Sequence, residues 1–410
     1  MKILIIGSLY EPDLGPSAPL FTMLSTHLAQ RGHQVTVITM VPHYPSGRIS
    51  AEFRKTLISS GVEKGVHVIR IGLPSVDRSK LLYRFLQYFC YQVGATVASF
   101  GQEYDVVLAA NPFLTVWLPF VSSVVLRRKP SIYSVHDVYP DVGVTLGIFR
   151  NRTVISAAAS LERFCLDRST RVRILSESFR PGMHALGVPD SRISLIYDWV
   201  DTTLIQPLNG GNSFSRDFHL EGRFVILYAG NIGRSQGLEQ VLKAAEHLSS
   251  DQEILFVLVG DGAAREALQE QARKSQLENV MFVPFQPRER LPEVLGSADI
   301  SLVLLSKGIG YSSLPSKLYS IFASGRPVLA SIDKGCETWE MISKADAGIC
   351  IAPEEPVLLA ETITMMKNNA ALRKQLGQNG RSWAEKHHSP QSAAEQFERL
   401  LSSVLAGVEQ

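Results

Sequence analysis

The sequence has few cysteines and lacks the short motifs of several large enzyme classes. Its four cysteines, at positions 90, 165, 336 and 350, form no Cys-x-x-Cys pair, which argues against a zinc site or a disulfide framework and fits a reducing cytosol. It also contains no Gly-x-Gly-x-x-Gly, no Gly-x-x-x-x-Gly-Lys and no His-Glu-x-x-His pattern. Nicotinamide-dependent dehydrogenases, P-loop NTPases and zincin proteases are therefore disfavoured.

Long apolar runs are absent as well. The nearest, residues 113–126, contains Pro119 and falls short of the roughly 18 apolar residues that a membrane span needs. The apolar run after Lys2 is shorter than the core of a signal peptide, and Glu11 and Asp13 follow it. We therefore expect a cytoplasmic protein, which would meet a membrane, if at all, at the inner face of the cell membrane.

Charge is balanced over the whole chain but unevenly distributed. Residues 1–200 hold 21 Lys and Arg against 14 Asp and Glu, and the remainder holds 20 against 25. A basic N-terminal half favours contact with an anionic surface such as a membrane leaflet, although random scatter would also produce a surplus of this size. We expect no nucleic-acid partner.

The first half of the chain alternates apolar strands with helices. Residues 2–8 form a β-branched run that ends in a polar turn, as a buried parallel strand does, and a helix with a stop at Gly32 follows. Further strands are expected at 33–40 and 65–72, and again later in this half. Strands separated by helices predict βαβ units in a doubly wound parallel sheet of the α/β class.

The pattern breaks at residues 200–217, a polar and turn-rich segment, and then restarts. We interpret this segment as a linker between two Rossmann-like domains, residues 1–203 and 204–385. Residues 386–410 are expected to form a helix that packs back on the N-terminal domain. Two such domains would face a central cleft, with a site in the loops beyond the carboxyl ends of their strands.

Residues 314–331, LPSKLYSIFASGRPVLAS, predict a short helix followed by a strand. Ser313 can cap the helix, and Pro315 fits its first turn, where the missing N–H costs nothing. The N–H groups of Ser316 and Lys317 would then point outward with the positive end of the helix dipole, and Lys317 adds a full charge. This edge suits an anion such as a phosphate; the alternative is a structural helix with a surface lysine.

Glycine-rich loops follow other strands. In residues 228–242 three glycines allow close backbone approach, and Arg234 offers a forked donor for a phosphate. Gly260 and Asp261 lie at a second strand-to-helix turn, where Asp261 either caps the helix or lines a ligand. Gly15, after the first strand, would let the backbone of the N-terminal domain touch a phosphate.

His136 and Asp137 follow an apolar strand of the first half. A histidine near its ordinary pKa can share protons with a sugar hydroxyl or a phosphate oxygen, so this position makes His136 a candidate catalytic residue. The alternative is a structural histidine.

Taken in order, the start of the chain, YAGNIGRSQGLEQVL, LVGDG and LPSKLYSIFASGRPVLAS resemble the retaining family 4 glycosyltransferases of GT-B fold. The resemblance covers nearly the whole chain and is greatest to the bacterial type that handles O-antigen, capsule or colanic-acid sugars in polysaccharide biosynthesis. Any one of these loops is weak evidence, whereas their order and spacing together are specific.

The resemblance implies a nucleotide-diphosphate sugar donor, with UDP or GDP as the nucleotide, bound mainly by the second domain. The implied donor-binding residues are Gly15, Arg234, Gln236, Gly260, Asp261, Phe285, Gln286, Pro315, Ser316, Lys317, Leu318, Tyr319 and Glu337. Arg234 and Lys317 would neutralise the diphosphate, the helix front would supply backbone N–H groups, and His136 would touch the transferred sugar. No metal ion or cofactor is implied, because basic residues and helix dipoles stabilise the leaving group.

The sequence departs from the family pattern at its acids. Where many members carry two glutamates, this chain has Ser312 and Ser320, and Gln236 replaces the usual lysine of its loop. Arg234 would then supply more of the positive charge that neutralises the diphosphate. Glu337 would supply a nearby carboxylate, or else be a surface residue.

The implied reaction moves a sugar, with retained anomeric configuration, to a hydroxyl of a saccharide acceptor such as one linked to undecaprenyl diphosphate. Asp137 is the acid expected to partner the acceptor. The aromatic-rich residues 81–100 would rest at a bilayer interface as a peripheral membrane contact, or else pack on their own sheet. Two rival functions are a sugar-nucleotide 2-epimerase and a non-catalytic nucleotide-sugar-binding partner, which the two serines favour.

Overall fold

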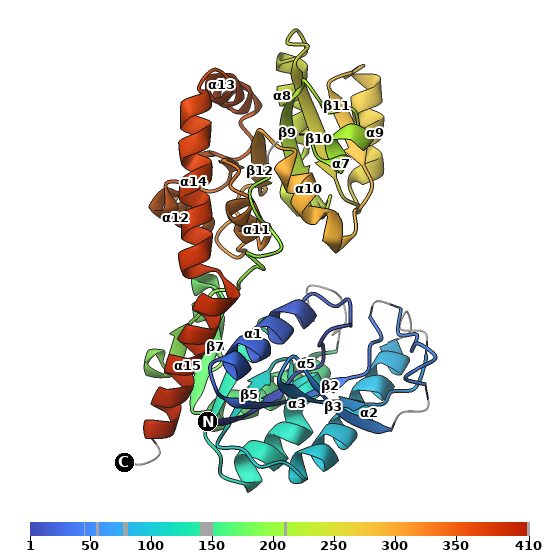
Figure 1. Cartoon of the computed structure of the whole chain (residues 1–410), viewed down its shortest axis with the longest axis vertical. Helices are drawn as coiled ribbons and strands as arrows, with labels where there is room; N and C mark the ends of the chain where they lie inside the picture. Colours follow the sequence, from blue (N-terminus) through green and yellow to red (C-terminus); the bar gives the residue numbers. More distant parts are fainter. Residues whose placement is uncertain (45, 55–56, 77–80, 140–150, 209–210, 408–410) are drawn as a thin grey trace. The chain divides into compact units, whose positions relative to one another are not determined.

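The computed structural model describes residues 1–410 apart from 45, 55–56, 77–80, 140–150, 209–210 and 408–410. The chain forms two compact units (Figure 1). The N-terminal unit comprises residues 1–198 and 390–410, and the C-terminal unit comprises residues 199–389. The turn-rich segment 200–217, interpreted above as a linker, thus belongs to the C-terminal unit.

Eight strands form the sheet of the N-terminal unit, in the order β3-β4-β2-β1-β5-β6-β7-β8. They are β1 (Lys2–Ile6), β2 (Gln34–Met40), β3 (Ile58–Glu63), β4 (Val66–Ile71), β5 (Val106–Ala110), β6 (Ser131–Val135), β7 (Arg171–Ile174) and β8 (Ile193–Leu195). The sheet is parallel except at its edge, where β3 runs antiparallel to β4. Lys64 and Gly65 connect these two strands with φ of 48° and 81°, as a two-residue hairpin turn requires.

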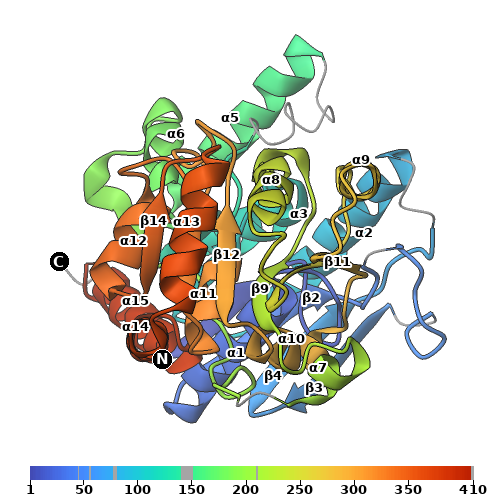
Figure 2. The same ribbon diagram turned by 90° about the horizontal axis from the view of Figure 1, so that it is seen from above.

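The helices of the N-terminal unit are α1 (Ala18–Gln30), α2 (Leu81–Phe100), α3 (Phe113–Phe120) with its continuation η1 (Val121–Leu126), α5 (Arg152–Arg168), α6 (Arg180–Ala185) and α15 (Pro390–Ala406). The last of them, α15, packs beside α1 (Figures 1 and 2). Arg31 at the end of α1 forms ion pairs with Glu398 (2.5 Å) and Glu395 (3.5 Å) of α15. The final helix is therefore part of the N-terminal unit, although the whole C-terminal unit precedes it in the chain.

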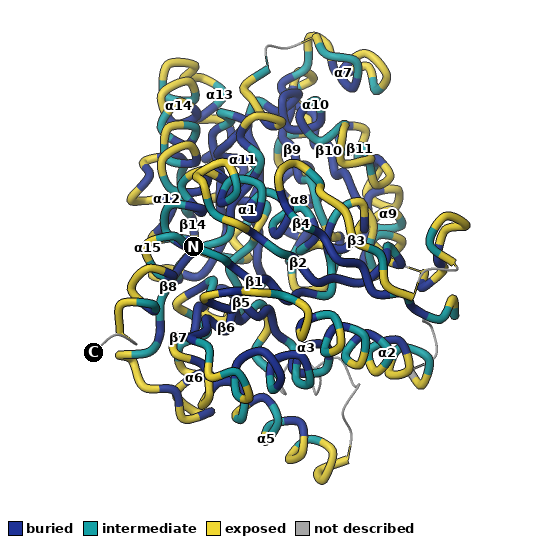
Figure 3. The backbone as a smooth tube through the Cα atoms, turned by 60° about the horizontal axis from the view of Figure 1, so that its bottom comes forward, coloured by how far each residue is buried: buried dark blue, intermediate teal, exposed yellow. Residues whose placement is uncertain are grey.

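Six parallel strands form the sheet of the C-terminal unit, in the order β11-β10-β9-β12-β13-β14. They are β9 (Phe224–Ala229), β10 (Ile254–Val259), β11 (Val280–Val283), β12 (Ile300–Leu304), β13 (Val328–Ser331) and β14 (Gly348–Ile351). The helices are α7 (Ser213–Asp217), α8 (Glu239–His247), α9 (Arg265–Lys274), α10 (Leu291–Gly296), α11 (Lys317–Ala323), α12 (Glu337–Ala345), α13 (Pro356–Lys367) and α14 (Ala370–His387). The central strands of both sheets are buried, because helices cover them (Figure 3).

Each sheet has one point at which the order of its strands reverses. It lies between β1 and β5 in the N-terminal unit and between β9 and β12 in the C-terminal unit. Open α/β sheets bind their ligands beyond the carboxyl ends of the strands at such points, because the loops there diverge.

Two glycines let α14 pack closely on α11. A Cβ on Gly377 of α14 would lie 2.1 Å from the carbonyl oxygen of Gly325, which follows α11. Gly325 itself has a φ of 68°, in the left-handed region that favours glycine. Since α11 begins at Lys317, this contact fixes the position of Lys317, the main candidate for binding an anion.

Replacing Gly377 with alanine should destabilise the C-terminal unit, even though alanine is the better helix former. Overpacking costs about 1–3 kcal/mol, and helix propensity returns only about 0.5–1 kcal/mol. Urea unfolding measures the change, and Gln378→Ala, at an exposed position of the same helix, is the control. A Gly377→Ala protein as stable as the wild type would contradict the close packing.

Candidate functional site

The candidate residues of the C-terminal unit lie in loops that follow neighbouring strands. Arg234 and Gln236 follow β9, Gly260 and Asp261 follow β10, and Lys317 begins α11 after β12. Parallel strands end at the same edge of a sheet, so these loops share one edge. This arrangement is the one expected from the sequence.

The side chain of Lys317 connects two of these loops. Its ammonium lies 2.8 Å from the hydroxyl of Tyr228 and 3.1 Å from Oε1 of Gln236. It also lies 3.9 Å from the centre of the Tyr228 ring, which is a close cation–π contact. Both partners are neutral, and no carboxylate among the residues that the structure describes forms an ion pair with Lys317.

Burial lowers the pKa of the Lys317 ammonium to about 7. The group is therefore about half protonated at neutral pH. An anion placed against it would favour the charged form and raise this pKa. The protein supplies a buried cation without an acidic side chain to neutralise it, and this chemistry favours an anionic ligand.

Three glycines allow the neighbouring loops to approach each other and Lys317. A Cβ on Gly230 would lie 3.1 Å from Nζ of Lys317, and a Cβ on Gly260 would lie 1.9 Å from the carbonyl oxygen of Gly230. A Cβ on Gly262 would lie 2.4 Å from the carbonyl oxygen of Ile232. These glycines also have positive φ values of 147°, 143° and 156°. Larger residues would push the two loops apart.

Arg234 and Phe285 present their side chains to solvent. Arg234 begins a short helical turn, residues 234–236, and is exposed. Phe285 follows β11 and is 76% exposed, an unusual position for a large aromatic residue. The side chain of Gln286, in contrast, already has a partner within the protein. Its Oε1 accepts a hydrogen bond from Arg290 at 3.2 Å.

The structure excludes one of the two roles considered for Asp261, that of capping the helix. Its Oδ1 accepts a hydrogen bond from the N–H of Gly262 at 2.8 Å, within its own loop. The N-cap of α9 is Ala264, which has no side-chain cap. Asp261 therefore does not cap the helix, and its exposed side chain lies at the edge where a ligand is expected.

The front of α11 differs in detail from the prediction. The helix begins at Lys317 with Ser316 as its N-cap, so the cap expected at Ser313 is wrong. The N–H groups of Leu318 and Tyr319 donate to carbonyls of the preceding turn at 3.0 and 3.2 Å. The N–H groups of Leu318 and Tyr319 are therefore already used, and Pro315 has none. Of the residues expected to offer backbone N–H groups, Ser316 and Lys317 remain.

Two residues of this edge were missed by the sequence reading. Tyr228 looked like one more member of an apolar strand. Asp333, just after β13, is buried and accepts hydrogen bonds from the N–H groups of Gly308 (2.8 Å) and Gly310 (3.0 Å), so it orders the loop that leads to α11. The sequence feature that could have revealed Asp333 is an acidic residue just after an apolar strand. Glu337 begins α12 after the same strand.

The pattern Gly-x-Ser-x-Gly, typical of serine hydrolases, occurs at residues 233–237. Such enzymes need a histidine bonded to the serine hydroxyl. Among the described residues, the hydroxyl of Ser235 is contacted only by Nε2 of Gln236, at 3.4 Å. The structure therefore gives this serine no catalytic partner.

In the N-terminal unit, Asp13 holds the loop that contains Gly15. Its carboxylate accepts hydrogen bonds from the N–H groups of Gly15 and His43, each at 2.8 Å. Burial opposes ionisation of Asp13, but the hydrogen bonds and the charge of His43 outweigh it and hold its pKa below its ordinary value. A buried, ionised acid thus orders the loop between β1 and α1.

His136 and Asp137 follow β6 as predicted, but their chemistry differs from the expectation. Burial, and then the nearby Arg173, lower the pKa of His136 to about 4. The expectation of a histidine near its ordinary pKa is therefore wrong, and the imidazole is neutral at pH 7. Asp137 has an exposed side chain.

Asn111, at the end of β5, fixes the backbone of both residues. Its Oδ1 accepts from the N–H of His136 at 2.8 Å, and its Nδ2 donates to the carbonyl of Asp137 at 2.6 Å. Beneath it lies Glu162 of α5, which is fully buried and accepts from the hydroxyl of Tyr133 at 3.0 Å. Burial raises the pKa of Glu162 to about 7.

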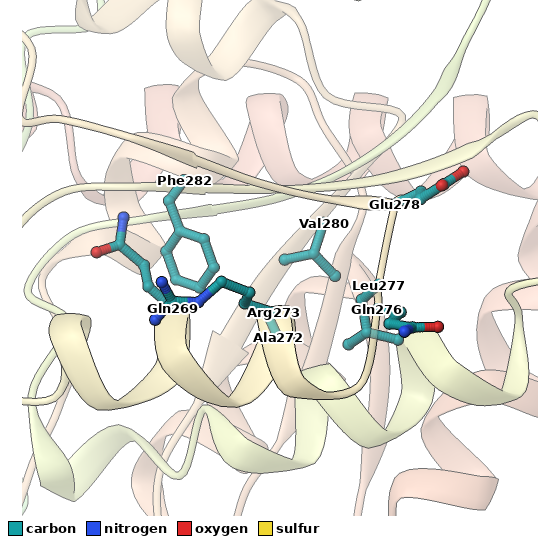
Figure 4. A pocket seen from close by; sticks show the side chains of 8 residues that line it. All are labelled: Gln269, Ala272, Arg273, Gln276, Leu277, Glu278, Val280 and Phe282. Atoms are coloured by element: carbon teal, nitrogen blue, oxygen red, sulfur yellow. The ribbon is translucent and has the colours of Figure 1, made fainter.

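A surface hollow beside α9 and β11 is separate from the residues above (Figure 4). It is lined by Gln269, Ala272, Arg273, Gln276, Leu277, Glu278, Val280 and Phe282. Over the described ranges of the chain, no group of His, Cys, Asp and Glu could hold a metal ion. Nor does any helix in the described part combine the length and apolar character needed to cross a membrane.

Two family descriptions match most of the chain. "Glycosyl transferases group 1" matches residues 212–383 in the C-terminal unit, and "Glycosyl transferase 4-like domain" matches residues 17–199. The chain belongs to this family of glycosyltransferases. The resemblance that the loop motifs indicated is thereby confirmed.

Named relatives of this glycosyltransferase match most of its length. It is 26% identical over 394 residues to the putative colanic acid biosynthesis glycosyl transferase WcaI of Escherichia coli K12, with 91% of this chain and 95% of WcaI covered. It is 27% identical over 297 residues to the probable glycosyltransferase WbjE of Pseudomonas aeruginosa, with 71% and 73% covered. The structure of Anabaena HepE in complex with UDP matches with a TM-score of 0.69 at 16% identity, over 98% and 100% of the two chains. The two α/β units expected of a GT-B glycosyltransferase are confirmed.

Glu162 should make the N-terminal unit less stable as the pH rises. Its pKa is about 7 in the folded protein against an ordinary 4.5. The folded state holds the proton more tightly, so this stabilisation is complete below about pH 4.5 and is lost as the pH rises to about 7. A pKa change of this size corresponds to about 3 kcal/mol at most.

Glu162→Gln should remove this part of the pH dependence. Urea unfolding of both proteins at about pH 5 and about pH 8 measures it. Asp167→Asn, which changes an exposed acid of the same helix, is the control. If the variant and the wild type lose the same stability between the two pH values, Glu162 does not titrate as stated.

Proposed function

We propose that this glycosyltransferase moves a sugar from a UDP-sugar to a hydroxyl of a saccharide acceptor in surface polysaccharide biosynthesis, with retained anomeric configuration. The name of WcaI, which refers to colanic acid biosynthesis, supports the class of pathway. The HepE complexes with UDP and with UDP-glucose support a uridine nucleotide in the donor. The proposed acceptor is a lipid-linked saccharide such as one on undecaprenyl diphosphate, which the family resemblance implies.

The observation that carries the proposal is the buried ammonium of Lys317. Desolvation disfavours its charge, and no acidic side chain of the described residues compensates. A diphosphate would supply two negative charges and restore the protonated form. Lys317 lies at the strand-order reversal between β9 and β12, where α/β folds bind nucleotides.

The neighbouring residues fit a diphosphate in the same place. Arg234 is exposed in the loop after β9 and can add a bidentate contact. Gly230 lacks a side chain beside Nζ of Lys317 and would let a phosphate oxygen approach the backbone there. Phe285 offers an exposed ring on which a base can stack.

Lys317 and Arg234 would act on the leaving group during transfer. As the bond between the sugar and the diphosphate breaks, negative charge develops on the departing UDP. Cations already in position stabilise this charge without reorganising at the moment of reaction. This assigns both residues to transition-state stabilisation as well as to donor binding.

In the N-terminal unit, we assign His136 and Asp137 to the sugar and the acceptor. The imidazole of His136 is neutral at pH 7, so it would donate or accept a hydrogen bond with a sugar hydroxyl rather than pair with a phosphate. Asp137, whose backbone is held by Asn111, would accept the proton of the attacking hydroxyl.

A second candidate function is nucleotide-sugar binding without transfer. It is favoured by Ser312 and Ser320, which stand where many family members carry acids. Incubation with UDP-glucose and a saccharide acceptor separates the candidates. Acceptor-dependent release of UDP supports transfer, and proton NMR of the product reports the anomeric configuration. Binding without turnover supports the second candidate, and a new UDP-sugar formed without acceptor supports a 2-epimerase.

Lys317→Met and Arg234→Ala should each weaken the binding of UDP-glucose. Each removes a charge-assisted contact of roughly 1.5–3 kcal/mol, which corresponds to about ten- to a hundredfold in affinity. Calorimetry at about pH 6, where Lys317 is protonated, measures the change. Lys243→Met, which removes an exposed lysine of α8, is the control and should bind as the wild type does. Unchanged affinity in both site variants would refute the diphosphate assignment.

The affinity for UDP-glucose should fall as the pH rises above about 7. Lys317 has a pKa of about 7 in the free protein, and the bound diphosphate raises it, so binding takes up a proton. The loss approaches tenfold for each pH unit above 7 until the pKa of the complex is reached. The diphosphate of a nucleotide sugar does not itself titrate in this range.

Two variants at the same position test this explanation. Lys317→Arg keeps the charge at every pH, because a guanidinium does not lose its proton, so its affinity should be flat between about pH 6 and about pH 9. Lys317→Met should be weak and equally flat. A fall above pH 7 that persists in both variants would assign the titration to another group.

A further inference from the structure

The outward face of α2 is apolar, which is the reverse of an ordinary surface helix. Its exposed positions are Leu82, Phe85, Leu86, Phe89, Val93, Val97 and Phe100, and their exposed fractions run from 40% to 75%. Every exposed side chain described on α2 is therefore a large apolar one. At 3.6 residues per turn these seven positions fall within a stripe about 120° wide along the whole helix. We call this set the α2 stripe.

The buried face of α2 is comparatively polar. Gln87 is fully buried and donates to the carbonyl of Pro74 at 2.9 Å. The hydroxyl of Tyr91 donates to the carbonyl of Ile38 at 2.9 Å, and Ser99 lies 3.0 Å from the hydroxyl of Ser122. These hydrogen bonds fix the rotation of α2 on its sheet. The α2 stripe cannot turn inward without leaving buried polar groups unsatisfied.

Basic side chains lie beside the carboxyl end of the α2 stripe. The guanidinium of Arg127 is 5.7 Å from the ring centre of Phe100, and Arg128 and Lys129 follow it in the chain. Arg128 is exposed, as is the apolar Leu126 before it. The sequence of α2 contains no Asp or Glu, and its single charged residue is Arg84. The surface therefore combines apolar side chains with positive charge.

We propose that α2 lies on the surface of an anionic lipid bilayer. The α2 stripe would enter the boundary between headgroups and acyl chains, and Arg127, Arg128 and Lys129 would contact lipid phosphates. The α2 stripe runs along the whole helix, whose 20 residues are about 30 Å long. The helix would therefore lie in the plane of the membrane.

Charge favours lipid over a second copy of the chain as the partner of this surface. Two α2 helices could pair their stripes, but pairing would bring together cations from both copies. No acid on α2 would neutralise them. Anionic headgroups provide that neutralisation together with an apolar layer. The inference goes beyond the proposed function, because it uses no residue of the donor site.

Vesicle flotation of the full-length protein tests the proposal. Vesicles of phosphatidylglycerol and phosphatidylcholine in equal amounts should carry the protein, and vesicles of phosphatidylcholine alone should carry much less. Phe89→Glu combined with Val93→Glu should lower binding by about tenfold or more, because carboxylates remove apolar insertion and repel the headgroups. Arg128→Ala combined with Lys129→Ala should weaken binding and reduce its dependence on salt.

A matched control uses exposed apolar residues elsewhere. Val357→Glu combined with Met365→Glu makes the same change on α13 and should leave vesicle binding intact. Thermal unfolding and UDP-glucose binding check that each variant is folded. Absence of wild-type binding to the anionic vesicles overturns the proposal, as does equal binding by the α2 variants. A dimer in solution that Phe89→Glu and Val93→Glu abolish, without any vesicle binding, would instead assign the surface to a second copy.

Discussion

The C-terminal unit buries the ammonium of Lys317 against a tyrosine hydroxyl and an amide oxygen instead of a carboxylate. Several neighbouring residues hold Lys317 in this position. Gly230 leaves room for the end of the lysine, and Asp333 orders the loop that leads to it. The close packing of Gly377 on Gly325 sets the helix from which it projects. The consequence is a cation whose charge is fully favourable only when an anion is bound.

The N-terminal unit uses buried acids in an analogous way, with two different outcomes. Asp13 is ionised because N–H groups and His43 stabilise its charge, and it orders the loop of Gly15. Glu162 receives fewer charged or backbone partners, and burial keeps its pKa near 7. Both acids act on backbone at the carboxyl ends of strands. They hold the candidate residues in place while remaining inaccessible to a substrate themselves.

The N-terminal unit carries an amphipathic helix, α2, whose apolar side faces outward. α2 places Gln87 and Ser99 inside and its phenylalanines outside. In water alone this orientation loses part of the free energy of apolar burial. Full burial of a large apolar side chain is worth roughly 1.5–3 kcal/mol, and the α2 stripe leaves 40–75% of each of its side chains exposed. Another apolar phase covering the helix would recover this free energy, which is the physical reason for proposing that α2 contacts a membrane.

The sequence by itself determined the alternation of strands and helices, the two α/β units, and the loops in which Lys317, Arg234, Gly260 and Asp261 lie. These features depend on periodicity and on glycine turns, which are local. It did not reveal the hairpin of β3, the start of α11 at Lys317, or the roles of Tyr228 and Asp333, because these depend on contacts between distant segments. Only the tertiary structure decided that His136 is neutral, that Lys317 has a pKa near 7, and that the phenylalanines of α2 face outward. Desolvation and the choice of the buried face are set by the neighbours that the whole fold brings together, and no short stretch of sequence contains them.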